Sequence, residues 1–281
     1  MPTLKEIKGR IGSVKSTLKI TSAMKLVSSA KLRKAQTAIE AMRPYQAQLQ
    51  RMLELVAGTA SEQLSVIPGE VGESPTAIVA VASNSSLRGG FNANVMAKVR
   101  SVRKPGDVVY SIGRKMADAM RKDGFPSPAD FSSLAEHPAY APAAELAEKL
   151  ALDVAEGRVA QVLLVYTHFV STARQTPVVD VLLAAGSAAL PSAEMEESPD
   201  AIIEPSAQEL QALLLPKTLK LKLYAALLDS AAAEHAARTV AMQTATDNGE
   251  QLLDELTLQY NKGRQQKITN EILDLAGGCG R

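Results

Sequence analysis

The segment 83–92, SNSSLRGGFN, is the part of this sequence whose residue types come closest to a ligand-binding loop. It lies between a predicted strand and a predicted helix, where the first backbone N–H groups of a helix can hold a phosphate. The residues do not complete such a site, because GxxxxGKS/T and GxGxxG are both absent from the segment. We therefore expect Gly89 and Gly90 to form a tight strand-to-helix turn.

Other side chains that could perform chemistry are few. His137, His168 and His235 are far apart and have no metal-ligand spacing, and Cys279 is the single cysteine, which excludes an internal disulfide. No paired carboxylates, Cys/His pair or Ser-His-Asp set stands out. We expect no catalytic site, no metal and no cofactor, and we expect His235 to be an ordinary helix residue.

The charge is concentrated at one end of the chain. Residues 1–51 contain eleven Lys or Arg and two Glu, whereas the whole chain has a net charge of +1. A basic end favours nucleic acid, anionic lipid or an acidic protein surface as a partner, unless it is only a solvated helix face. Aromatic residues make up 4% of the chain and the basic residues are dispersed, so nucleic acid ranks below a protein partner.

Membrane insertion is not expected. The chain has no run of about 18 apolar residues. Its start, MPTLKEIKGRIGS, has neither the apolar core of a signal peptide nor the pattern of a transit peptide. Any membrane association should therefore come through a partner.

Residues 3–57 are predicted to form one long helix, interrupted only by Pro44, which should kink it near Glu40. Spacings of three and four between apolar residues indicate a left-handed coiled coil about 80 Å long. The apolar seam consists of Leu4, Ile7, Ile11, Val14, Leu18, Leu32, Ala35, Ile39, Met42, Leu49, Leu53 and Val56.

The seam contains one polar gap, at Thr21, Lys25 and Ser28. Apolar residues move there to another face of the helix, at Ile20, Ala23, Met24 and Val27. One interpretation is a loosely packed stretch of coiled coil. The other is that the helix here faces something other than its partner helix.

The middle of the chain predicts an α/β domain. Buried-strand patterns at 76–83, 107–113, 159–169 and 176–185 alternate with helical patterns at 91–102, from 114, and at 143–157. This alternation favours a parallel or mixed, Rossmann-like sheet with helices on its faces. Residues 58–75 are expected to be a linker and 186–200 a mobile acidic loop.

The C-terminal segment predicts a second long helix. Ser206 and Glu209 form a capping-box pattern at its start, and Pro216 is a predicted break or kink. Its predicted heptad seam is Met242, Ala245, Gly249, Leu252 and Leu256. Two such helices should pair antiparallel, which gives the expected domains 1–57, 58–205 and 206–281. These residues alone rank a coiled-coil interaction protein above a nucleic-acid binder, and both above an enzyme.

Both ends of the chain resemble the gamma subunit of F-type ATP synthases. The resemblance rests on KITSAMKLVSSAKLRKAQ at 19–36 with Arg43-Pro44-Tyr45, and on EHAARTVAMQTATDNGEQLLDEL at 234–256. The family signature of Ile-Thr-x-Glu, an acidic residue and Gly-Ala appears here as Ile268-Thr269-Asn270-Glu271, Asp274 and Gly278-Cys279, with Cys in place of Ala. The loop at 83–92 departs from the family pattern, since Asn84, Ser85, Ser86 and Arg88 replace Asp, Arg, Gly and Cys.

The resemblance implies a central rotor shaft that couples proton-driven rotation of a membrane c-ring to ATP synthesis at beta-subunit sites, and the reverse during hydrolysis. It implies a non-catalytic subunit, with a ring of alpha and beta subunits, an epsilon subunit and the c-ring as partners. We expect a peripheral location on the cytoplasmic face of a bacterial plasma (inner) membrane.

The resemblance also implies two groups of contact residues, each of which could otherwise be an ordinary solvated helix residue. The first should face an acidic lever loop of the beta subunits: Lys19, Ile20, Thr21, Ala23, Met24 and Lys25. The second matches polar positions that meet other beta-subunit loops: Arg238, Arg264, Gln265, Thr269 and Glu271.

Overall fold

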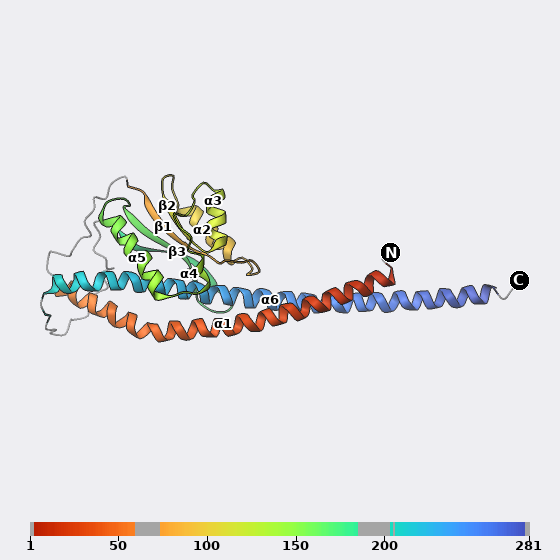
Figure 1. Ribbon diagram of the computed structural model, residues 1–281. Coiled ribbons are helices and arrows are strands. Elements are labelled where there is room, and N and C mark those ends of the chain that lie inside the picture. The colour runs from red at the N-terminus through yellow and green to blue at the C-terminus, as the bar shows by residue number, and fades with distance from the viewer. Residues whose placement is uncertain (1–2, 60–73, 185–202, 205, 279–281) are drawn as a thin grey trace.

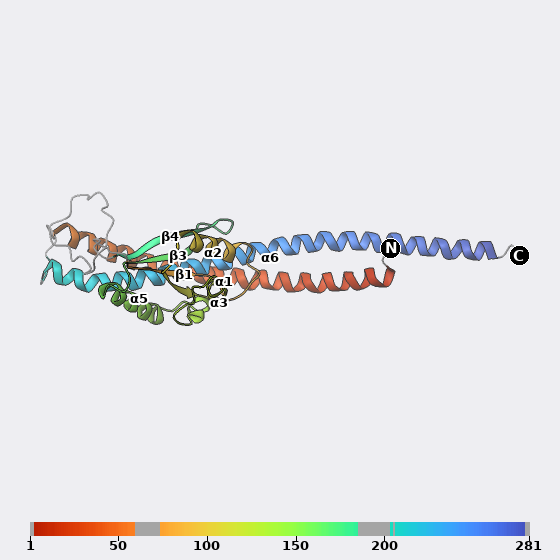
Figure 2. The same cartoon turned by 90° about the horizontal axis from the view of Figure 1, so that it is seen from above.

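The structure, a computed structural model, describes residues 3–59, 74–184, 203–204 and 206–278. Helix α1 (Leu4–Thr59) and helix α6 (Ala207–Gly278) lie side by side and antiparallel, with the α/β domain against them (Figures 1 and 2). Neither Pro44 nor Pro216 ends its helix. The predicted linker 58–75 and acidic loop 186–200 fall largely or wholly outside the described residues.

Both long helices begin at side-chain caps. Ser206 Oγ accepts a hydrogen bond from the Glu209 N–H, as the capping pattern predicts. Thr3 and Glu6 form the full reciprocal box at the start of α1, where each backbone N–H donates to the other side chain. This second cap was missed in the sequence, although its Thr-x-x-Glu pattern could have revealed it.

The two helices pack through a seam with a single antiparallel register. Leu18 lies against Gly249, where an added Cβ would come within 2.7 Å of Leu18 Cδ2, and Leu4 lies in the same way against Gly263. The absence of a side chain at these glycines therefore lets the two backbones approach closely. Gly249, a member of the predicted seam, is thus at the contact between the helices.

The predicted seam of α6 is correct at Met242, Gly249 and Leu256 but wrong at its other two positions. Ala245 is exposed and Leu252 is 45% exposed, whereas Thr246 is buried and Leu253 is half-buried. The seam runs through Thr246 and Leu253. A search for apolar residues alone picks Ala245 and Leu252 instead, each one residue too early.

The sheet has four strands in the order β2-β1-β3-β4. Strands β1 (Thr76–Val81), β2 (Val108–Ile112) and β3 (Gln161–Phe169) are parallel, and β4 (Gln175–Ala184) pairs antiparallel with β3. The predicted mixed α/β sheet is confirmed, and its antiparallel edge strand returns the chain toward α6.

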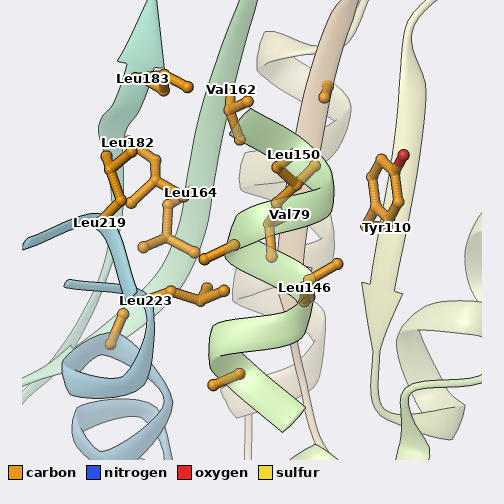
Figure 3. Close-up of a cluster of buried hydrophobic side chains, with 14 of the residues drawn as sticks. Val79, Tyr110, Leu146, Leu150, Val162, Leu164, Leu182, Leu183, Leu219 and Leu223 are labelled. Carbon is orange, nitrogen blue, oxygen red and sulfur yellow. The ribbon is translucent and has the colours of Figure 1, made fainter. Parts of the chain in front are cut away.

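Helices cover both faces of this sheet. On one face, α2 (Phe91–Val102) and α3 (Arg114–Lys122) bury Val95, Val99, Met116 and Met120 against β1, β2 and β3. On the other face lie α4 (Ser132–Glu136), α5 (Tyr140–Ala155) and the first half of α6. Figure 3 shows Leu219 and Leu223 of α6 beside Leu164 of β3 and Leu182 of β4. The C-terminal helix therefore belongs both to the coiled coil and to the domain core.

Candidate functional site

The predicted gap in the α1 seam is a polar layer within a continuous coiled coil. Thr21 Oγ1 and Thr246 Oγ1 are 2.9 Å apart, and Lys25 Nζ donates to Gln243 Oε1 at 2.7 Å. Ser28 is 1% exposed. At these seam positions α1 therefore still faces α6, because hydroxyl and amide groups replace apolar contacts without separating the helices. Whether the other face of α1 meets a further partner stays a prediction.

The opposite face of α1 at this level is apolar and open. Ile20, Leu26 and Val27 are 60%, 68% and 57% exposed, and Lys19 and Ala23 are also exposed. Such a stripe on a charged helix has the composition of a contact surface. We call Lys19, Ile20, Ala23, Leu26 and Val27 the collar.

The predicted contact residues from 19 to 25 therefore divide into two groups. Lys19, Ile20 and Ala23 lie on the collar, while Thr21 is buried against α6. Met24 and Lys25 are half-buried at its border. Lys19, Ile20 and Ala23 are thus open to a partner, whereas the Thr21 hydroxyl is engaged by Thr246 of α6.

The C-terminal end of α6 projects beyond α1. Gly263 is opposite Leu4, the first residue of α1, and Figure 2 shows α6 extending past this end of α1. Arg264, Gln265, Thr269 and Glu271 are all exposed here, which both a contact role and an ordinary solvated helix face allow, so their contact with beta subunits stays a prediction. Apolar side chains accompany them, with Ile272 59% and Leu273 62% exposed. We call residues 264–274 the tip.

Arg238 lies in a different setting, at the junction between the coiled coil and the loop 83–90. Its side chain is 14% exposed, with Nη2 3.6 Å from Glu234 Oε1 and 3.4 Å from Ser85 Oγ. Its predicted contact with a beta subunit stays a prediction, although it does not share the open setting of the tip.

The junction is built on a buried ion pair that sequence reasoning missed. Arg88 Nη2 lies 2.8 Å from Glu234 Oε1, and the two side chains are 6% and 8% exposed. Arg88 also donates to Ser83 Oγ and to the Ser85 carbonyl. Gly89 has a φ of +55°, which supports the predicted tight turn, and Gly90 caps α2. The loop is thus held to α6 through its arginine.

Burial governs the electrostatics of this junction. Desolvation raises the pKa of Glu234 and lowers that of Arg88, although each partner's charge acts in the opposite direction. Desolvation, followed by the charges of Arg238, Lys31 and Arg88, lowers the pKa of His235 to about 4. His235 is therefore neutral at physiological pH.

We expect the chain to lose stability as the pH falls from 7 toward 4. Between pH 6.5 and pH 4 the unfolded state protonates His235 more readily than the folded state does, so acid favours unfolding. This amounts to up to about 2 kcal/mol between pH 7 and pH 5. The raised pKa of Glu234 acts with the opposite sign, because the folded state then binds that proton more readily.

Urea unfolding at pH 7, 6 and 5 measures this loss. His235→Gln should show a smaller loss than the wild type, while His137→Gln, at an exposed position, should behave like the wild type. Equal acid sensitivity of His235→Gln and the wild type would contradict the assignment.

The described residues contain no group of three or more His, Cys, Asp or Glu side chains able to hold a metal ion. Across the same residues, no helix combines the length and apolar character needed to cross a bilayer. Exposed apolar side chains on the two long helices gather at the collar and at the tip, which are the candidate surfaces.

Comparison with known proteins decides the family. Residues 3–280 match the ATP synthase family profile. ATP synthase gamma chains of Phocaeicola vulgatus and Bacteroides fragilis are each 46% identical, over 99% of this chain and 99% of theirs. The chain belongs to the ATP synthase gamma-chain family. The Moorella thermoacetica gamma chain is 35% identical over 99% of both chains.

Chains of solved ATP synthase structures have the same fold as this chain. A chain of the Euglena gracilis mitochondrial ATP synthase, in an OSCP/F1/c-ring structure, aligns with a TM-score of 0.67 at 17% identity, over 98% of this chain and 93% of that one. A chain of the central stalk and c-ring of the Tetrahymena thermophila mitochondrial enzyme aligns with a TM-score of 0.57 at 22% identity, over 80% of this chain and 99% of that one.

Proposed function

We propose that this gamma-family chain is the central rotor shaft of an F-type ATP synthase. The proposal rests on one observation above all: the paired helices extend away from the α/β domain and end in the projecting tip of α6 (Figure 1). A rod of this kind can enter a ring of subunits while its domain stays outside. Gamma chains similar over their full length support the same role.

Torque transfer follows from the asymmetry of the shaft. The collar lies on one side of the coil, and residues 1–51 carry eleven basic residues against two acidic ones. As the shaft turns, this surface meets each beta subunit in succession. A rotating contact of this kind changes nucleotide affinity only if it binds the subunit's conformations with different free energies. The shaft itself is non-catalytic and works through the alpha and beta subunits.

The α/β domain and the adjoining part of the coil face the other partners, the epsilon subunit and the c-ring. We place the chain peripherally on the cytoplasmic face of a bacterial plasma membrane, held there by the c-ring. Affinity purification of the tagged chain from its native membranes tests this assembly. Alpha, beta, epsilon and c subunits should co-purify stoichiometrically, and their absence would rule out the rotor-shaft role.

We expect Met24→Lys and Thr269→Ala to impair coupling more than assembly. Met24 borders the collar and Thr269 lies on the tip, so neither change opens the core. The number of protons pumped per ATP hydrolysed should fall about fivefold. This corresponds to the loss of about 1 kcal/mol of coupling free energy, the low end of the typical range. The measurement is acidification of inverted vesicles, normalised to the amount of assembled complex.

Thr257→Ala is the matched control. Thr257 and Thr269 are both exposed on α6, and each hydroxyl donates to the carbonyl four residues earlier. Thr257, however, lies within the stretch that is paired with α1. If Thr257→Ala and Thr269→Ala uncouple the complex equally, or if both variants fail to assemble, the tip has no special contact role.

A further inference from the structure

A hollow of about 300 Å³ lies where the loop 83–90 meets the coiled coil. Its charged lining comes from α1, the loop, α3, α4 and α6, which are distant in sequence. The cations are Lys31, Arg88, Arg114 and Arg238, and the carboxylates are Glu136 and Glu234. The hollow therefore carries two more positive than negative side chains, and His235, the remaining titratable group in its lining, is neutral.

The excess charge is not satisfied within the described part of the chain. Glu234 Oε1 pairs with Arg88 Nη2 at 2.8 Å and lies farther from Arg238 Nη2, at 3.6 Å. Lys31 and Arg114 have no carboxylate within salt-bridge distance among the described residues, although Lys31 interacts with the charge of Glu234, and Arg114 with that of Asp130, at longer range. Two guanidinium Nε–H groups, those of Arg88 and Arg238, are buried and lack acceptors among the described residues. Two residues that line the hollow therefore carry buried N–H donors without a partner in the described chain.

The loop that borders the hollow is held in place from both sides. Asn84 donates to the Ser132 carbonyl and accepts from the Arg114 N–H, while Ser85 Oγ lies 3.4 Å from Arg238. These contacts hold the loop that carries Arg88 before any ligand arrives, whereas the side chains of Lys31 and Arg114 are exposed. Preorganised donors cost a ligand little ordering free energy.

We propose that this hollow binds a small dianion of the phosphate class. Two excess positive charges match the charge of such an ion, and guanidinium groups with an ammonium group are the donors that phosphate prefers. The bound ion bridges α1, α3 and α6, and so fastens the α/β domain to the coil. The site is separate from the collar and the tip.

Titration of the full chain with inorganic phosphate tests the site, with sodium chloride at equal ionic strength as the reference. Phosphate should raise the melting temperature by a few degrees beyond the chloride reference, because a ligand of the folded state stabilises it. Calorimetry should give one phosphate per chain.

Arg114→Gln and Lys31→Gln should each weaken phosphate binding roughly tenfold, as expected for loss of one charge-assisted contact. Both residues are exposed and unpaired within the described chain, so the variants should fold. Lys122→Gln, at the other end of α3, is the matched control and should bind like the wild type. Phosphate stabilisation no greater than that of chloride, or equal binding by all three variants, would overturn the proposal.

Discussion

Replacing Glu234 with leucine is expected to lower the free energy of unfolding by about 3–5 kcal/mol, the usual cost of leaving a buried charge without its partner. Glu234 is 6% exposed and lies 2.8 Å from Arg88, which is itself buried. Without the carboxylate, Arg88 and Arg238 would face each other across a dehydrated junction. Chemical denaturation, followed by circular dichroism, measures the loss.

The direction of the pKa shifts makes a sharper version of this prediction possible. Desolvation raises the pKa of Glu234 and lowers the pKa of Arg88, and in each case it outweighs the attraction of the partner's charge. The free-energy cost of burying the two charges therefore exceeds the gain from their attraction. The double variant Arg88→Met with Glu234→Leu should therefore be more stable than either single variant. A double-mutant cycle isolates this interaction.

Glu148→Gln serves as the control for charge removal. Glu148 pairs with Lys220 at the surface, where its side chain is 58% exposed, so the variant should unfold with the wild-type midpoint. If the two single losses at Arg88 and Glu234 simply add in the double variant, the residues act independently and the junction is not held by their pairing.

The long helices could be predicted because their signal is local and repeated. A period of 3.5 in apolar residues fixes both helices and their antiparallel pairing, and the small residue Gly249 indicates close approach. The polar layer resisted prediction for a physical reason. Thr21 and Thr246 satisfy each other by a hydrogen bond, so a seam position need not be apolar when its partner supplies the complementary group.

The junction could not be predicted from the sequence at all. Arg88 and Glu234 belong to separate elements, and each alone has the appearance of an ordinary surface residue. Only the packing of the loop on α6 brings them together and removes them from water. At the tip, the coil register accounts for the exposure of residues 264–271, whereas their contact role is implied by the family resemblance alone and stays a prediction.

The α/β domain is expected not to fold when residues 74–184 are expressed without α6. Leu219, Leu223 and Leu227 of α6 complete the core that α5 and the sheet begin, and Leu223 is fully buried. Burial of three leucines contributes roughly 5–9 kcal/mol. That loss is comparable to the whole stability of a typical domain, about 5–15 kcal/mol. The fragment should show no cooperative thermal transition.

A fragment of residues 74–240 supplies the missing face of the core and should recover a cooperative transition. Within it, Leu223→Ala should cost about 2–5 kcal/mol, as for other buried leucines, whereas Leu213→Ala, at a 56% exposed position of the same helix, should cost little. Cooperative folding of 74–184 alone would mean that α6 merely covers a finished domain. If 74–240 folds and 74–184 does not, the domain and the coiled coil must rotate as one body. The reason is that the single helix α6 both completes the domain core and forms half of the coiled coil.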